Sequence, residues 1–140
     1  MPKLGDSSSG RAVPAQGAAD LSLPKESLIR ATAEFAQCYA SGRRLHTRHF
    51  LLFIASPAEG DAGIRMGTAV SRKTGHAVVR NRIKRILRET FRLSIRHLPV
   101  SARLVVVAKR QAGTAGLGLD QVSAELMEAL TRYFHLRQGA

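Results

Sequence analysis

Positive charge is the most concentrated chemical feature of the sequence, and it gathers between residues 80 and 97. At about 100° per residue, one side of a helix here would carry an arc of mostly apolar residues: Val79, Ile83, Ile86, Leu87, Thr90, Phe91 and Ser94. Seven basic side chains fall outside this arc or at its border: Arg80, Arg82, Lys84, Arg85, Arg88, Arg92 and Arg96. A single acid, Glu89, cannot neutralise them, and like charges four residues apart repel. The stretch therefore predicts an amphipathic helix whose cationic face binds a polyanion.

The side chains that could support hydrolysis by the protein itself are His46, His49, Glu59 and Asp61. In a nuclease they would act as acid, base and metal ligands. The two carboxylates fall in a glycine-containing loop, and no cysteine or nearby carboxylate completes a zinc site with the two histidines. We therefore expect neither a catalytic group nor a metal site in this chain.

Two aromatic residues, Phe35 and Tyr39, are spaced to share one face of a short helix. Thr32 is its expected N-cap and Gly42 its expected end. From spacing alone, core packing is favoured for both rings over a role as a ligand platform. Cys38 is the single cysteine, which excludes an intramolecular disulfide, and we expect it to be a buried apolar residue.

Net charge indicates the class of partner. The chain has 140 residues and a net charge of +12, which points to nucleic acid or an anionic membrane surface. Residues 65–110 hold 13 basic and 1 acidic side chains, so nearly the whole excess lies on one central segment. No apolar run approaches the length of a membrane span, and the first 20 residues lack the apolar core of a signal peptide. We expect a cytoplasmic protein without membrane contact.

Composition predicts one domain behind a tail. Residues 1–20 are rich in Ser, Gly and Ala and have almost no large apolar side chain, so we expect them to be disordered. With 44% hydrophobic residues, the remainder can form a single domain with a modest core, expected over residues 21–137. Residues 138–140 form its C-terminal end.

Three strands and a final helix are expected around the basic helix. The strands are predicted at residues 46–55, 64–72 and 103–108, and the last is apolar enough to be central in a sheet. In the strand at 64–72, one face is small, polar and cationic, which would let a bulky ligand approach closely. Asp120 is the expected cap of the final helix. Its inner face would carry Val122, Leu126, Leu130, Tyr133 and Phe134.

Residues 71–91, SRKTGHAVVRNRIKRILRETF, resemble the signature of the bacterial ribonuclease P protein, whose named core motif is Arg80-Asn81-Arg82. His76 departs from that pattern, because the family usually has Asn there, which tolerates a positive φ better. The resemblance covers roughly residues 23–134. Further matches occur in the family's order: Glu34-Phe35 with Tyr39, residues 41–44, residues 49–54, Arg65-Met66-Gly67 and residues 105–110.

This resemblance implies a single α/β domain of the ribosomal protein S5 domain 2-like class. Its elements would follow the order αβββαβα around a central mixed sheet, with a left-handed crossover carrying the basic helix. General topology rules would instead favour a right-handed crossover. The residues themselves indicate only two strands before the basic helix, so the third rests on the resemblance.

The resemblance also assigns binding roles. Phe35, Tyr39 and Phe53, with the small face of the strand at 64–72, would line a cleft for the single-stranded 5′ leader of precursor tRNA. Because unstacked bases pile on aromatic rings, the first two rings then become a leader platform rather than core. The residues implied to contact the RNA subunit are Arg72, Lys73, Arg80, Asn81, Arg82, Lys84, Arg85 and Arg88.

The family protein has no nuclease site of its own. It binds a large catalytic RNA, ribonuclease P RNA, and assists that ribozyme in removing the 5′ leader from precursor tRNA. The resemblance thus implies the protein component of an endoribonuclease, acting as a monomer in a 1:1 complex with the RNA. Catalytic groups and Mg²⁺ would belong to the RNA subunit.

Three alternatives share parts of this pattern. A general basic RNA-binding or RNA-chaperone module would have the same charge but no preference for the ribozyme or for a leader. A DNA-binding protein could lay residues 80–96 in a major groove, although no second helix lies close enough before them to form a helix-turn-helix. A self-sufficient nuclease would need the histidines and carboxylates described above to converge.

Overall fold

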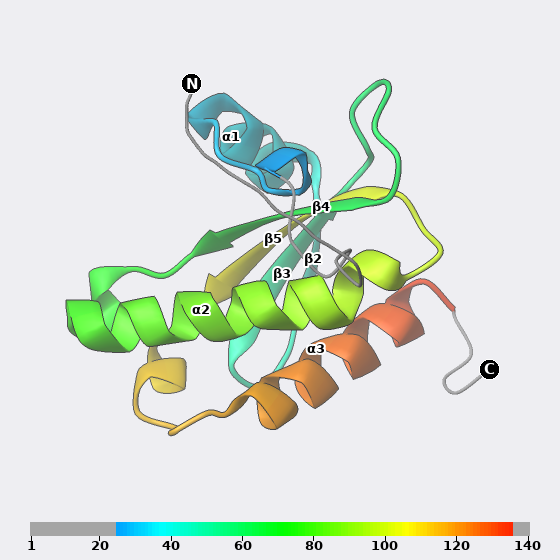
Figure 1. Ribbon diagram of the computed structural model, residues 1–140. Coiled ribbons are helices and arrows are strands. Elements are labelled where there is room, and N and C mark those ends of the chain that lie inside the picture. The colour runs from blue at the N-terminus through cyan, green and yellow to red at the C-terminus, as the bar shows by residue number, and fades with distance from the viewer. Residues whose placement is uncertain (1–24, 136–140) are drawn as a thin grey trace, which may run out of the picture.

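The helices and strands follow the order αβββαβα along the chain (Figure 1). The structure, a computed structural model, describes residues 25–135, so the predicted tail at 1–20 and the end at 138–140 lie outside it. The helices and strands of the described part are α1 (Thr32–Ser41), β2 (Arg43–His46), β3 (Phe50–Ala55), β4 (Ile64–Ala69), α2 (Ala77–Leu93), β5 (Ala102–Ala108) and α3 (Leu119–Tyr133). Short 3₁₀ turns join them: η2 (Lys25–Ser27), η3 (Arg72–Thr74), η4 (Ile95–His97) and η5 (Arg110–Gly113).

The strands form one mixed sheet in the order β2-β3-β5-β4. β3 is antiparallel to both of its neighbours, whereas β4 and β5 are parallel and are connected through α2. In Figure 1, β4 and β5 both point to the left and α2 lies in front of the sheet. Because β5 ends below β4 in this view, the crossover is left-handed. The mixed sheet, the central place of β5 and the crossover are thus confirmed.

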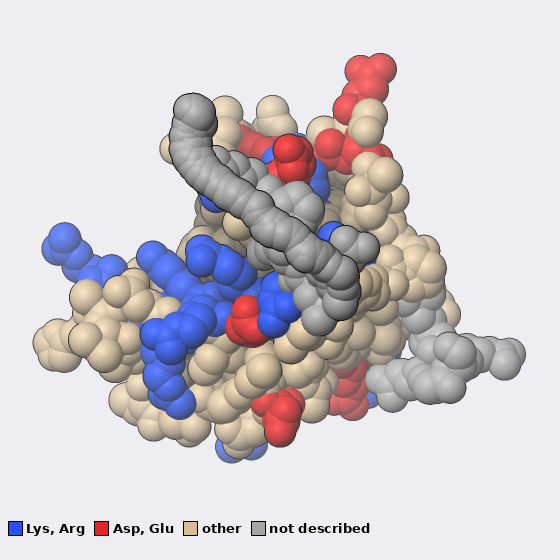
Figure 2. All heavy atoms as spheres, viewed as in Figure 1, with Lys and Arg blue, Asp and Glu red and all other residues tan. Residues whose placement is uncertain are grey.

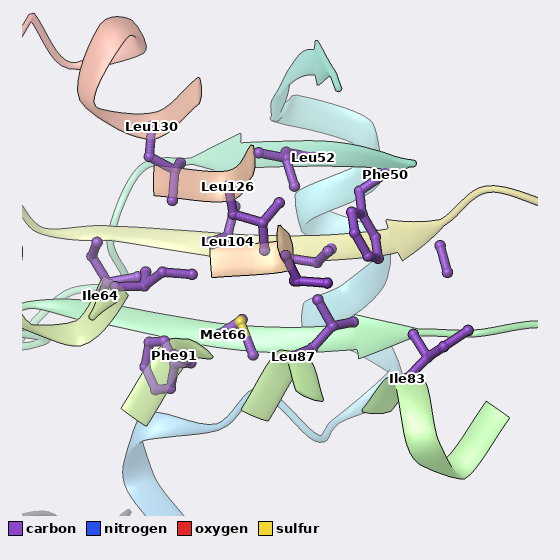
Figure 3. Close-up of a cluster of buried hydrophobic side chains, with 14 of the residues drawn as sticks. Phe50, Leu52, Ile64, Met66, Ile83, Leu87, Phe91, Leu104, Leu126 and Leu130 are labelled. Carbon is purple, nitrogen blue, oxygen red and sulfur yellow. The ribbon is translucent and has the colours of Figure 1, made fainter. Parts of the chain in front are cut away.

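Each face of the sheet carries its own apolar cluster, because alternate side chains of a strand point to opposite faces. Beneath α2 and α3 lies the larger cluster, in which Phe50 and Leu52 of β3 meet Leu87 and Leu126 of the helices (Figure 3). The smaller cluster lies on the α1 face and comprises Ile29, Cys38, Phe53, Ala55 and Val105. The basic helix and the helix with the aromatic pair therefore cover opposite faces.

The predicted inner faces of the two long helices are confirmed, but α2 is shorter than expected. The helix ends at Leu93, and Ile95–His97 form the separate turn η4. Ile95 is fully buried in the larger cluster, and the chain leaves the helix immediately before it. The buried helical residues are Ile83, Leu87, Thr90 and Phe91 in α2 and Val122, Leu126, Leu130 and Thr131 in α3.

The strand predicted for residues 46–55 is confirmed only over Phe50–Ala55, because the chain reverses just before Phe50. β2 and β3 form an antiparallel hairpin in which His46 pairs with Leu51. The Thr47 N–H donates to the Phe50 carbonyl (2.8 Å), and the Thr47 hydroxyl accepts from the Phe50 N–H (3.1 Å). β2 is the third strand before α2 that the resemblance implied.

Two predicted helix caps are also wrong. Ala31, not Thr32, precedes α1, and Gly118, not Asp120, precedes α3. At the start of α3, the side-chain oxygen of Gln121 accepts from the Gly118 N–H at 3.0 Å. A residue inside the helix thus stabilises its first turn, as in one half of a capping box.

Candidate nucleic-acid interface

The exposed face of α2 is cationic, and its single acid is already paired (Figure 2). Glu89 accepts from Arg92, with an oxygen–nitrogen distance of 2.6 Å, and this hydrogen bond lowers the pKa of the Glu89 carboxyl. Asn81, Arg85 and Arg88 are exposed, and residues 25–135 provide no ion pair for these two arginines. The helix therefore presents positive charge that the described part of the protein leaves uncompensated.

Two arginines of the Arg80-Asn81-Arg82 motif are held by backbone carbonyls. Arg80 Nε donates to the Gly75 carbonyl at 3.1 Å, and Arg82 Nη2 donates to the Leu117 carbonyl at 2.7 Å. A carbonyl accepts the hydrogen bond without cancelling the charge. These contacts fix the direction of both guanidinium groups while leaving them cationic.

The turn before α2 adds two more exposed cations, Arg72 and Lys73. Gly75 provides the positive φ of the turn (155°), and His76 follows as the N-cap of α2 with φ −71°. The position where the family usually has Asn thus requires no left-handed backbone here, and His76 fits it without strain. The helix begins directly after it, at Ala77.

On the opposite face of the sheet, the three predicted aromatic residues come together. The Tyr39 and Phe53 ring centroids are 4.9 Å apart in an edge-to-face arrangement, and those of Phe35 and Tyr39 are 6.3 Å apart. Tyr39 is 40% exposed, whereas Phe53 is 7% exposed, so Tyr39 offers the most accessible ring surface of this pair. The Arg44 guanidinium lies 5.7 Å from the Phe53 centroid, which places a cation beside the aromatic group.

The small face of β4 is occupied at Gly67 by the protein's own side chain. A Cβ placed on Gly67 would lie 2.7 Å from Phe35 Cζ and 3.1 Å from Ile29 Cβ. The missing side chain thus lets the Phe35 ring rest on the strand. The expectation that this face is left open for a ligand is wrong at Gly67, because α1 packs there.

A charged network fastens α1 to the sheet. Arg65 of β4 donates to the Glu34 carboxylate of α1, and Arg103 of β5 donates to Gln37 Oε1 at 2.8 Å. Arg103 also lies 3.8 Å from the Glu34 carboxylate. The hydrogen bond to Glu34 raises the pKa of Arg65, so this cation stays charged. Phe35 and Tyr39 are positioned by the helix that this network holds.

The four side chains that a self-sufficient nuclease would need, His46, His49, Glu59 and Asp61, do not converge. His46 and His49 lie at the hairpin before β3, whereas Glu59 and Asp61 lie in the loop after it. Six residues of extended strand separate these two ends by roughly 20 Å. His49 Nδ1 instead contacts Glu125 Oε1 (2.8 Å), and Asp61 pairs with Arg65 (3.4 Å).

The surroundings of the other reactive groups in residues 25–135 fit a structural role. Cys38 is completely buried, and burial raises the pKa of its thiol, which agrees with the predicted packing role. Within residues 25–135, no three His, Cys, Asp or Glu side chains gather as a metal site would require. No helix in this part is long and apolar enough to cross a bilayer.

Comparison with known proteins connects this cationic helix to a family. The family model described as Ribonuclease P matches residues 23–133, which include all helices and strands described above. The chain belongs to the ribonuclease P protein family. Its membership confirms the resemblance read from residues 71–91, and it makes the chain a protein component of ribonuclease P, which acts in the processing of tRNA 5′ ends.

Relatives and solved structures of ribonuclease P proteins agree with this placement. The ribonuclease P protein component of Desulfovibrio desulfuricans is 52% identical over 110 residues, which cover 79% of this chain and 85% of the relative. The Staphylococcus aureus RNase P protein structure has a TM-score of 0.67 at 28% identity and covers 76% of this chain and 94% of its own. For the Thermotoga maritima RNase P protein the TM-score is 0.66 at 26% identity, and the match covers 74% of this chain and 94% of the Thermotoga maritima chain.

Sequence reasoning missed the residues that position the aromatic group. In the sequence, Glu34 and Arg65 are only parts of separate matches to the family, and their pairing with each other depends on the fold. Arg44 was likewise part of a match without a role. One signal for these partners was available in the sequence. Arg65 and Arg103 lie in predicted strands, whose successive side chains point to opposite faces, and a charged side chain on a covered face requires a partner.

Proposed function

We propose that the chain binds ribonuclease P RNA through the cationic face of α2 and the turn before it. The uncompensated charge of this face is the observation that carries the proposal. Phosphate contacts position a protein on RNA without reading sequence, and the deep groove of an RNA duplex hides its bases. The helix would therefore recognise the backbone and shape of the folded ribozyme. The residues proposed to make these contacts are Arg72, Lys73, Arg80, Asn81, Arg82, Lys84, Arg85 and Arg88.

The aromatic group on the other face would hold the 5′ leader of precursor tRNA. Stacking of an unpaired base on an aromatic ring contributes about 1–3 kcal/mol. Tyr39 has the accessible ring surface for such stacking, while Phe35 and Phe53 support it from α1 and β3. Arg44 would add a cation for the leader backbone.

In this proposal the chemistry stays with the RNA subunit. A Mg²⁺-activated water held by the RNA would attack the phosphodiester. One copy of the protein would bind one RNA, reduce the repulsion between ribozyme and substrate, and lower the Mg²⁺ concentration that cleavage requires. The separation of the histidines from Glu59 and Asp61 supports a protein without its own active site.

Substrate preference of the reconstituted holoenzyme tests the proposal. With a bacterial ribonuclease P RNA, the native protein should increase affinity for precursor tRNA over mature tRNA. Tyr39→Ala should reduce that preference about fivefold, equivalent to about 1 kcal/mol for one lost stacking contact. Tyr39→Phe keeps the ring and should retain the preference. Equal affinity for both tRNAs with the native protein would favour the general RNA-binding module.

A further inference from the structure

The loop that follows β5 reaches back to the start of the basic helix. It comprises residues 110–118, begins with η5, and in Figure 1 passes below the end of α2 at which that helix starts. Ala112 and Leu117 are buried in the larger apolar cluster, whereas residues 114–116 between them are exposed. Two buried side chains thus hold the loop against the helices on either side of its exposed tip.

The first contact of this loop is with the cationic turn before α2. A Cβ placed on Gly113 would lie 1.7 Å from the Thr74 carbonyl oxygen and 2.8 Å from the carbonyl carbon. Both distances are below an ordinary van der Waals separation of about 3.5 Å, and no side-chain rotation can relieve a clash with backbone atoms. The φ of Gly113 is negative, so a left-handed backbone is not what requires glycine here. The missing side chain itself lets η5 pack on η3.

The second contact is with the Arg80-Asn81-Arg82 motif. Arg82 Nη2 donates to the Leu117 carbonyl at 2.7 Å, and the buried Leu117 side chain fixes the position of that carbonyl. Arg82 is itself exposed. A guanidinium group has five N–H donors, so the others stay available to phosphate oxygens. The loop therefore orients this cation without covering it.

One loop thus contacts both halves of the cationic surface. Gly113 lies against the turn that carries Arg72 and Lys73. The Leu117 carbonyl holds Arg82 on the helix. Ordering of long basic side chains opposes binding, and affinity rises when the free protein already restricts them. The separation between the two halves is then set before RNA binds.

We propose that Gly113 and Leu117 are positioning residues for the ribonuclease P RNA interface, because their loop sets the separation between the cationic turn and Arg82. The inference rests on the proposed function, which it deepens by giving two uncharged residues a role in RNA binding. Neither residue needs to touch RNA. A neutral change at residue 113 should therefore weaken assembly as the loss of a positive charge does.

Assembly of the full chain with ribonuclease P RNA over a range of salt concentrations tests this proposal. Gly113→Ala should weaken assembly about three- to tenfold at low salt, the range expected when one or two side chains lose their prior ordering. The slope of log affinity against log salt should become shallower by about 0.7–0.9 for each displaced phosphate contact. A loss of stability alone would not change the slope of the folded protein, so the slope separates positioning from folding.

Double-mutant cycles identify the contacts through which residue 113 acts. In Arg82→Ala and Lys73→Ala backgrounds, Gly113→Ala should cost less affinity than in the native protein, because part of what it displaces is already absent. In an Arg85→Ala background its cost should be unchanged. Arg85 lies about one turn beyond Arg82 and makes no hydrogen bond within residues 25–135.

Two other glycine substitutions serve as matched controls. Gly118→Ala changes the same loop, but its Cβ would lie 4.0 Å from Gln121 Oε1, so assembly should stay at the native value. Gly42→Ala would place a Cβ 2.4 Å from the Cys38 carbonyl oxygen at the end of α1, on the other face of the sheet. It should destabilise the protein and leave the salt slope unchanged.

Leu117→Val is the second variant, should Gly113→Ala fail to fold. It shortens the side chain that fixes the carbonyl, so it should weaken assembly and lower the slope in the same direction. An unchanged slope in the folded variants, or a cost that adds fully in both the Arg82→Ala and Lys73→Ala backgrounds, would overturn the positioning role and leave the proposed function intact. Native assembly that is equally tight without Arg82 and Lys73 would instead contradict the proposed function itself.

Discussion

At the scale of single residues, Gly67 shows how one missing side chain shapes the candidate leader surface. Because a Cβ there would meet Phe35 Cζ at 2.7 Å, the glycine sets the distance between α1 and β4. The same contact half-buries the Phe35 ring, which leaves Tyr39 as the exposed aromatic residue of α1. Core packing and the proposed leader contact are therefore divided between two residues, Phe35 and Tyr39, that sequence spacing alone does not distinguish.

Gly67→Ala should displace α1 and destabilise the protein by about 1–3 kcal/mol, the usual cost of overpacking. Urea unfolding of the full chain measures this cost. Leader discrimination by the holoenzyme should fall more than affinity for the RNA subunit, because α2 lies on the other face of the sheet. In a Phe35→Leu background the same substitution should cost less. An equal cost in both backgrounds would remove the Phe35 contact as its cause.

At the scale of elements, the charge on α2 makes a prediction about salt. Arg85 is exposed and has no ion pair among the described residues. Arg85→Ala should weaken assembly with ribonuclease P RNA, and the slope of log affinity against log salt should become shallower by about 0.7–0.9 for the lost phosphate contact. Arg132→Ala on α3 is the matched control and should leave the slope unchanged. The same slope for Arg85→Ala and native protein would exclude this side chain from the contact.

The β2–β3 hairpin is held by α3 through Glu125. This carboxylate accepts from the Thr47 hydroxyl (2.6 Å) and from the His49 N–H (2.7 Å). Burial by itself would raise the pKa of Glu125, but these hydrogen bonds outweigh it, and the pKa lies below its ordinary value of 4.5. Stability from this contact is therefore fully present above pH 4.5 and is lost as the pH falls through the lowered pKa.

Glu125→Gln should lower the free energy of unfolding by about 1–2 kcal/mol at neutral pH, because the hydrogen bonds lose their charged acceptor. The difference between native and variant protein should shrink as the pH falls below 4.5. Denaturant unfolding from pH 7 to pH 3 measures both effects. A difference that stays constant over this range would show that Glu125 does not titrate as argued.

The same hairpin shows what sequence reasoning could and could not predict. The strands β4 and β5 and the helix α2 follow from local patterns of apolar and charged residues, and these were predicted. The turn at residues 47–49 contains no Gly, Pro, Asn or Asp, and its stabiliser Glu125 is 78 positions from Thr47 in the chain. The candidate interface shows the same contrast. The cationic helix follows from a local pattern, whereas the Arg65–Glu34 pair forms only when distant segments meet.

At the scale of the whole molecule, the two candidate RNA surfaces lie on opposite faces of one sheet. The cationic α2 covers one face and the aromatic side of α1 the other, with the edge of β4 between them (Figures 1 and 2). A complex that uses both surfaces must pass around this edge. In the proposed function, the protein is thus placed between the ribozyme and the leader, where it can influence cleavage while the chemistry stays with the RNA.

The most direct test of this account is 5′-leader cleavage of a precursor tRNA by a bacterial ribonuclease P RNA at limiting Mg²⁺, with and without the protein. We expect cleavage at the leader junction only when both components are present, and none with the protein alone. Absence of stimulation, together with tight binding to unrelated RNAs, would contradict the account and leave a general basic RNA-binding module. Cleavage by the protein alone, abolished by Asp61→Asn, would also contradict the account, because it would place an active site in the protein.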